Sequence, residues 1–140
     1  MAFTGNWTTN AFKTGLMDGT FNFTSGSFYL ALYTNSATLD AMTTAYTATG
    51  EASGGNYVAG GNLLTIAQVP TVGNGDTAFI SFNNTSWTGA ITARGALIYL
   101  SGGGNPAVCV LDFGADKTST ATFTVQFPAV TNTSAIIRIS

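Results

Sequence analysis

The stretch ALIYLSGGGNPAVCVLDF, residues 96–113, carries two nearly unbroken apolar runs separated by a turn signal. The runs, residues 96–100 and 107–113, have the length of strands, and their continuous apolar character is typical of strands covered on both faces. Between them, a glycine-rich segment ends in Asn-Pro, a combination typical of turns. We therefore predict a pair of antiparallel central strands around which the rest of the fold is built.

Other segments alternate apolar and polar residues, as half-buried strands do. The pattern is found at residues 27–33, 77–82 and 122–127, and in the last of these Phe123, Val125 and Phe127 face inward. Residues 135–139 are more continuously apolar and predict another strand covered on both faces. Eight or nine short strands, roughly as this spacing gives, indicate an all-β fold. We predict one domain, residues 1–140, with an antiparallel, jelly-roll-like β-sandwich.

One short helix is predicted near the N-terminus, within residues 8–19. Phe12 and Leu16 are spaced to share one helical face. Thr9 or Asn10 could cap the start of the helix, and Gly19 could end it. Residues 1–26 are thus expected to form an N-terminal arm with this helix. Residues 35–61 predict a long functional loop with one helical turn at 39–43.

The composition points to an assembly component. Only 7% of the residues are charged, histidine is absent, and the formal net charge is −2. A surface of hydroxyls and amides packs against other proteins with little desolvation of charge. Nucleic-acid binding has no electrostatic basis in such a chain. The sequence also predicts no membrane span and no signal peptide, so we expect synthesis in the cytoplasm of a host cell.

Residues 110–120, VLDFGADKTST, contain two fragments of catalytic motifs. Asp112-Phe113-Gly114 matches the magnesium-binding triplet of protein kinases, but the other kinase motifs are absent. A phosphate-binding loop would need a glycine directly before Lys117, where Asp116 stands. Asp112 and Asp116 could form a carboxylate pair of the glycosidase type, but a hairpin tip at Asp116-Lys117 explains them more simply.

No other catalytic constellation is present. Without histidine the usual Ser or Cys triad cannot form, and Cys109 lies among apolar residues of a strand. Carboxylates alone would have to bind a metal, and their spacing does not match a calcium loop. We therefore predict that the protein is not an enzyme and uses no cofactor and no metal.

Three charged residues are candidates for structural or interface ion pairs. Arg94 begins one apolar strand, Arg138 lies within the last one, and Asp112 lies on the second face of its own strand. An arginine in an apolar strand needs a partner, because an unpaired buried charge is costly. Two interpretations remain open: an internal pair with Asp112, or an arginine that crosses a subunit interface.

Four aromatic residues in or near predicted loops are candidate contacts for a ligand or another subunit: Trp7, Tyr46, Tyr57 and Trp87. Exposed aromatic side chains mark binding surfaces, although aromatic residues are more often part of a core.

The order of short motifs resembles that of a group of small virion proteins of tailed bacteriophages. That group shows an Asn-x-Phe-Lys opening, a strand ending in Ala-Leu-Tyr-Thr, an Ile-Thr-Ala-Arg-Gly-Ala-Leu-Ile-Tyr strand and Leu-Asp-Phe-Gly-x-Asp-Lys-Thr-Ser-Thr. This chain carries matching motifs at residues 10–13, 31–34, 37–40, 43–46, 51–54, 57–61, 91–99 and 111–120. It departs from the group at Thr122, where a short insertion is expected.

The resemblance implies a structural role in the virion. The first expectation is a capsid decoration, or cement, protein that sits on the outer head surface as a homotrimer and clamps major capsid protein subunits. The second is a tail or tail-fibre component, whose partners would be other tail proteins or a glycan on the host surface. The resemblance carries no catalytic motif.

Overall fold

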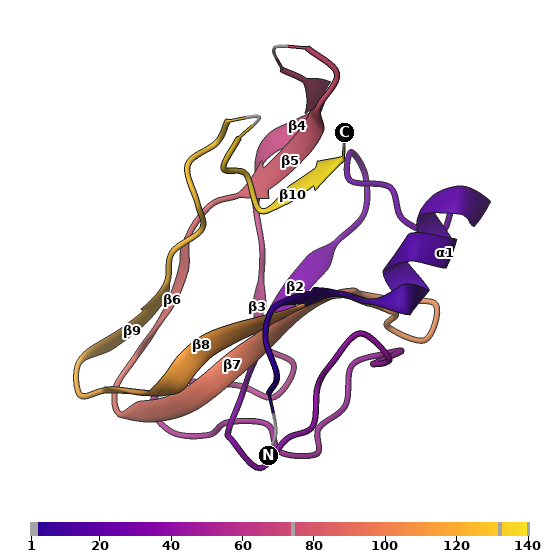
Figure 1. The fold of residues 1–140 in the computed structure, drawn as a ribbon. Helices are drawn as coiled ribbons and strands as arrows, with labels where there is room; N and C mark the ends of the chain where they lie inside the picture. Colours follow the sequence, from indigo (N-terminus) through magenta and orange to yellow (C-terminus); the bar gives the residue numbers. More distant parts are fainter. Residues whose placement is uncertain (1–2, 74, 132, 140) are drawn as a thin grey trace.

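The computed structural model describes residues 3–73, 75–131 and 133–139 (Figure 1). The predicted antiparallel β-sandwich with one short N-terminal helix is confirmed. The elements follow in the order β1 (Trp7–Thr8), α1 (Asn10–Asp18), β2 (Phe28–Tyr33), β3 (Asn62–Leu63), β4 (Ile66–Val72), β5 (Ala78–Phe82), β6 (Thr85–Thr88), β7 (Ile91–Leu100), β8 (Ala107–Ser119), β9 (Thr122–Val125) and β10 (Ile137–Ile139). The strands form sheets of five (β1-β8-β7-β2-β3), three (β10-β5-β4) and two (β6-β9).

The opening stretch of the sequence forms the centre of the largest sheet. β7 pairs with β2 on one side and with β8 on the other, both antiparallel. The turn between β7 and β8 places Asn105 at φ 55°, a left-handed conformation that asparagine tolerates better than most residues. Leu97, Ile98 and Val110 are completely buried, as expected of strands with protein on both faces.

β8 is longer than the sequence predicted, and this corrects the expected hairpin tip. The strand does not end near Phe113 but continues to Ser119, so Asp116 and Lys117 lie within it. Lys117 lies opposite Ala93 of β7, and the register shifts between this pair and the next one, Gly95 with Asp112. The shift is a bulge in which Gly114 takes φ 84°, a conformation open to glycine. In the sequence, the polar residues and the glycine of this bulge have the composition of a turn.

Beyond the bulge, the antiparallel β7–β8 pair bends sharply and continues past the bend as the antiparallel β6–β9 pair. Ile91 pairs with Ser119 before the bend, the Gly89 N–H donates to the Ala121 carbonyl within it, and Thr88 pairs with Thr122 after it. Figure 1 shows this bend at the lower left, with β6 and β9 rising from it. The true turn between β8 and β9 therefore lies at residues 120–121.

The two faces of β2 contact two different cores. Phe28, Leu30 and Leu32 point into the larger core, here called the aromatic core, which also receives side chains from α1, β5, β6, β7, β8 and β9. Ala31 and Tyr33 point into a smaller core on the opposite face, here called the loop-side core. The sequence correctly predicted this division of the strand into two faces.

β10 corrects the prediction of a covered strand at residues 135–139. It is a short edge strand of the three-stranded sheet, and among the described strands it pairs with β5 alone. Ile137 is buried in the aromatic core, whereas Arg138 and Ile139 are exposed. A run of apolar residues thus ends at a sheet edge rather than in a sheet centre.

The helix begins and ends as the sequence predicted. The Thr9 hydroxyl accepts a hydrogen bond from the Phe12 N–H at 3.0 Å, and Gly19 ends the helix in the left-handed conformation at φ 82°. The same Thr9 hydroxyl donates to the Ala107 carbonyl at 2.9 Å, which ties the helix to β8. The helix is therefore capped and docked by one residue.

The N-terminal arm and the long loop cover the second face of the central sheet. Phe3 is fully buried and forms a parallel bridge with Leu39 of the loop. Its ring fills the space that a Cβ on Gly95 would occupy, so glycine is required there. Residues 34–61 contain no helix or strand, and the predicted helical turn is a hydrogen-bonded turn from Asp40 to Thr43.

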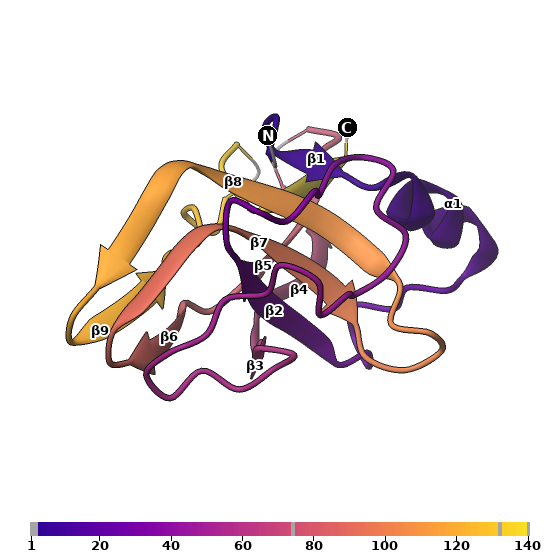
Figure 2. The ribbon, with the colours of Figure 1, turned by 90° about the horizontal axis from the view of Figure 1, so that it is seen from below.

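Figure 2 shows this loop crossing in front of β2 and β7. In the part of the chain that the structure describes, the only helix is too short and too polar to cross a membrane.

Candidate functional site

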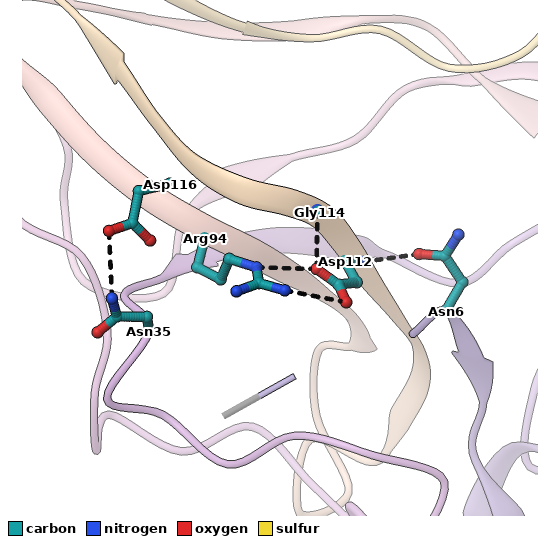
Figure 3. Close-up of polar contacts among 6 residues, drawn as sticks. All are labelled: Asn6, Asn35, Arg94, Asp112, Gly114 and Asp116. Carbon is teal, nitrogen blue, oxygen red and sulfur yellow. Dashed lines mark hydrogen bonds and ion pairs between the residues drawn. The ribbon is translucent and has the colours of Figure 1, made fainter. Parts of the chain in front are cut away.

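Asp112 lies at the centre of a polar cluster on the edge of β8 (Figure 3). Its carboxylate accepts a hydrogen bond from Arg94 Nε at 3.0 Å and another from Arg94 Nη2 at 3.4 Å, so the ion pair is bidentate. It also accepts from the Gly114 N–H at 2.8 Å, and the Asp112 N–H donates to Asn6 Oδ1 at 2.6 Å. One of the two interpretations of the arginines is thereby realised: Arg94 forms the internal pair with Asp112.

The pKa of Asp112 lies below its ordinary value. Burial alone would raise the pKa, but the Gly114 N–H, the hydrogen bond from Arg94 and the arginine charge together outweigh it. The carboxylate is therefore ionised at neutral pH and has all its neighbours in place. The contacts of Asp112 stabilise the bulge of β8 and connect this strand to Asn6 of the N-terminal arm, so the charge has a structural role.

Asp116 does not join Asp112 in a catalytic pair. Its carboxylate accepts from Asn35 Nδ2 at 3.1 Å, which links β8 to the long loop. Figure 3 shows Arg94 between the two carboxylates, and each acid points to a different partner. Separate hydrogen-bond partners thus hold the two carboxylates, which favours structural contacts over the glycosidase-type pair.

Arg138 has a different environment from Arg94. It is exposed on the edge strand β10, opposite Phe79 of β5. Among the described residues the only ion pair is that of Arg94 with Asp112, so an internal pair between Arg138 and Asp112 is not formed. Of the two interpretations, the internal pair with Asp112 is thus formed by Arg94 and not by Arg138, whose side chain the sheet edge leaves in water. Its role at a subunit interface stays a prediction.

The two tryptophans differ sharply in exposure. Trp7 lies on β1 with 41% of its surface exposed, and its indole N–H donates to the Thr4 hydroxyl at 3.2 Å. Trp87 lies within β6, not in a loop, and is only 2% exposed in the aromatic core. Buried and exposed residues alternate along β6, and Trp87 is on the buried face. Trp87 is therefore not available to a ligand or a partner surface.

Tyr46 and Tyr57 converge on Glu51, a residue for which the sequence suggested no role beyond a turn. The Tyr46 hydroxyl donates to Glu51 Oε1 at 2.7 Å, and the Tyr57 hydroxyl donates to Oε2 at 2.6 Å. The Gly60 N–H also donates to Oε2, at 2.7 Å. We name Glu51, Tyr46, Tyr57 and Gly60 the Glu51 cluster.

The Glu51 cluster fixes the long loop to the central sheet. The Leu32 N–H of β2 donates to the Tyr57 hydroxyl at 2.9 Å, and the Tyr99 hydroxyl of β7 donates to the Gly60 carbonyl at 2.7 Å. One signal in the sequence could have revealed this arrangement. Residues 35–61 contain acids but no Lys or Arg, so an acid held there must find N–H and O–H donors.

The tyrosines of this face serve as hydrogen-bond donors. Burial, followed by the hydrogen bond to Glu51 and its charge, raises the pKa of Tyr46 to about 12. Burial and the Glu51 charge raise the pKa of Tyr99 to about 12 as well, and the same causes raise that of Tyr57 further. All three hydroxyls keep their protons at physiological pH and can therefore donate hydrogen bonds. The hydrogen bonds of the cluster hold the loop against the sheet.

A reactive thiol and a metal site find no support in the described part of the chain. Cys109 is almost fully buried, and burial raises the pKa of its thiol to about 12, which keeps it protonated. Within residues 3–73, 75–131 and 133–139, Cys, Asp and Glu side chains nowhere gather in threes that could hold a metal ion.

Among the grooves on the described surface, two are the most relevant to binding. The first, of about 420 Å³, lies inside the bend between β8 and β9 and is lined by Thr, Ser and Gln side chains with Phe113, Phe123 and Lys117. The second, of about 400 Å³, lies between α1 and the three-stranded sheet and is mostly apolar, with Phe12, Phe79 and Ile137 in its wall. Both are shallow surfaces suited to contacts with another molecule.

Comparisons with models of protein families, with curated proteins and with solved structures each find no match for this chain.

Proposed function

We propose that this protein is a structural subunit of a tailed-bacteriophage virion, and specifically a capsid decoration protein that binds the outer head surface and stabilises the shell. The observation that carries the proposal is the character of the surface. Ten large apolar side chains of the described residues are exposed, in a chain with only ten charged residues. The motif order given above, which resembles that of virion proteins, supports the same role.

Such a surface favours contacts with other proteins. Met17 is 82% exposed on α1 and Met42 is 76% exposed in the long loop. Burying apolar area of this kind contributes roughly 25 cal/mol per Å². The surrounding hydroxyls and amides exchange hydrogen bonds with water for hydrogen bonds with a partner, at a lower desolvation cost than charges would have.

The mechanism we propose is avidity. A homotrimer would touch several major capsid protein subunits at once, so that weak single contacts add up to tight attachment. The protein would then act as a clamp whose own fold does not change. The acids Asp112 and Glu51 are consistent with this role, because their contacts hold the fold itself.

A second candidate is a tail or tail-fibre component that binds a host receptor or glycan. The exposed ring of Trp7 favours it, because exposed aromatic rings stack on sugars. The hydroxyl-lined groove between β8 and β9 would add hydrogen-bonding groups.

Binding to phage heads distinguishes these candidates. Purified protein is added to expanded, emptied heads of a phage that carries this gene but lacks the protein, and both binding and the melting temperature of the heads are measured. The decoration role predicts saturable binding and a higher melting temperature. Binding to host cells or their polysaccharide, with none to heads, would instead establish the tail role.

Variants of the exposed apolar residues sharpen the experiment. Met17→Gln and Met42→Gln leave the core untouched because both side chains are in water. If one of these positions lies on the shell-binding face, its variant binds heads more weakly while its unfolding curve stays unchanged. An electron-microscopy map of the virion would then show which face meets the shell.

A further inference from the structure

Among the charged residues, Asp76 is distinguished by its lack of a described partner, and Lys117 is distinguished from the other unpaired basic residues, Lys13 and Arg138, because it lines a groove. Five of the six acids accept a hydrogen bond from a described residue. Those five are Asp18, Asp40, Glu51, Asp112 and Asp116. Asp76, next to the β4–β5 turn, is exposed, and none of the described residues binds its carboxylate. Lys117, exposed on β8, likewise has no ion-pair partner among the described residues.

Lys117 is the one charged residue in the wall of the groove inside the ribbon bend. It lies opposite Ala93, which is buried in the aromatic core, so its side chain projects from the face of β8 that turns towards β9. Beside it, Phe113 is half-buried and packs against Phe123 with ring centroids 6.2 Å apart. The groove therefore combines a positive charge with a partly exposed apolar floor.

The β4–β5 hairpin has the complementary character. It projects from the top of the molecule in Figure 1. On its outer strand Val69 and Val72 are 49% and 63% exposed, and Asp76 lies in the turn before β5 begins at Ala78. β4 contains Pro70 and irregular register, features that hinder pairing of its edge with another strand. Contacts through side chains are thus better suited to this hairpin than backbone pairing.

We propose that the β4–β5 hairpin of one copy docks into the groove between β8 and β9 of a second copy, with Asp76 against Lys117 and the valines over Phe113. The groove is lined by residues of β8, β9 and the bend between them, and Figure 1 shows this bend at the opposite end of the molecule from the β4–β5 hairpin, so the contact cannot form within one chain. The opposite charges fix which end of the hairpin meets the lysine, because like charges in contact are strongly unfavourable.

This contact joins two different surfaces, so each copy offers a hairpin and a groove to its neighbours. A heterologous contact of this kind closes into a ring when the rotation allows it. The inference deepens the proposed function by naming the contact that builds the homotrimer, and it rests on that function for the biological use of the ring. Self-association is measured in purified protein without heads, so its failure leaves head binding as a separate result.

Charge reversal tests the contact. Lys117→Glu and Asp76→Lys are each expected to weaken self-association by about tenfold or more, since each places like charges together. The double variant Lys117→Glu/Asp76→Lys restores the opposite charges in reversed order and should recover most of the affinity. Sedimentation equilibrium over a range of concentrations measures the mass, and circular dichroism verifies the fold of each variant.

The matched control is Lys13→Glu, which makes the same change at an exposed position on α1. It should leave the association constant within about twofold of the wild type. Wild-type protein that stays monomeric at every concentration would overturn the proposal. So would a double variant that associates no better than the single ones.

A cross-link gives a second, independent measurement. Asp76→Cys/Lys117→Cys places one thiol on the hairpin and one in the groove, while the native Cys109 remains buried. Mild oxidation should yield covalent oligomers larger than dimers, which either single variant cannot form because it carries one exposed cysteine. Failure of the double variant to exceed the dimer would contradict the proposed contact.

Discussion

The two faces of the central sheet are covered in two different ways. On one face the aromatic core is built mostly from regular elements and is nearly all apolar. Its phenylalanine rings pack in neighbouring pairs whose centroids are at most 6.4 Å apart, and these rings belong to Phe12, Phe23, Phe28 and Phe82. On the other face a loop without regular structure and the N-terminal arm cover a smaller core. This second face depends on the hydrogen bonds of the Glu51 cluster as well as on packing.

The difference separates two physical tasks. Apolar burial stabilises without direction, so it can join sheets whose edges and angles are irregular. A long loop has no ladder of backbone hydrogen bonds to define its path, and directed bonds to a charged group can fix it instead. We therefore expect the aromatic core to set the stability of the whole fold and the Glu51 cluster to set the position of the loop.

The largest expected effect tests the aromatic core. Phe28 is 1% exposed and stacks on Phe23, so Phe28→Ala should lower the free energy of unfolding by about 3–5 kcal/mol. Tyr29→Ala, the next residue on the opposite face, should cost clearly less because Tyr29 is half-buried. Denaturant unfolding measures both variants. Equal losses would show that the two faces contribute equally and would remove the distinction.

The next effect tests the Glu51 cluster. Glu51→Ala leaves two tyrosine hydroxyls and the Gly60 N–H without their acceptor, and it should cost about 2–3 kcal/mol. Glu51→Gln is the matched control, since it keeps one carbonyl oxygen and most of the shape. Hydrogen exchange should rise in residues 34–61 of Glu51→Ala and stay unchanged in β7 and β8. A uniform rise throughout the chain would mean that the cluster supports the whole fold instead.

The sequence was most informative where local rules decide the structure. Alternation along β2 predicted both of its faces, and the capping residues Thr9 and Gly19 predicted both ends of the helix. It was least informative where distant segments meet. The sequence predicts a hairpin tip at Asp116-Lys117 where the structure has a bulge inside β8, because a break in the apolar pattern does not show whether pairing resumes after it.

The candidate site shows the same limit. The cost of an unpaired charge indicates that an arginine in an apolar strand needs a partner, but it leaves the internal pair and the interface both open. The pairing of Arg94 with Asp112 depends on the register of β7 against β8. Glu51 was missed because its partners come from the loop and from β2 and β7, which alternation cannot bring together. Trp87 was assigned to a loop because the strand that holds it, β6, is short.

A smaller effect is expected at the ion pair on the loop side of the sheet. Asp112→Asn should cost about 1 kcal/mol at neutral pH, because the pair is near the surface. The folded pKa of Asp112 lies below its ordinary value of 3.8, so this stability is present above that value and is lost as the pH falls through the lower folded pKa. The difference between wild type and variant should therefore shrink in acid.

The control for this pH dependence is Asp76→Asn, which removes an exposed acid that has no partner among the described residues. In dilute protein at neutral pH its free energy of unfolding should match that of the wild type, because none of the described residues binds this carboxylate. Urea unfolding from pH 7 down to about pH 2, a range that spans the ordinary pKa of aspartate, provides the measurement. A constant difference between wild type and Asp112→Asn across this range would show that the carboxylate charge does not contribute.

The smallest effect is expected at Arg138, which lies on the edge strand β10 outside the central sheet. Because its side chain is exposed on an edge strand, Arg138→Ala should change the free energy of unfolding by less than about 0.5 kcal/mol. Arg94→Ala is the comparison, since it removes the same side chain from a pair with Asp112 and leaves that carboxylate without its counter-charge. A loss at Arg138 as large as that at Arg94 would show that edge and sheet centre do not differ as the structure implies. A change in self-association alone, with unfolding unaltered, would place Arg138 at the subunit interface that its sequence position first suggested.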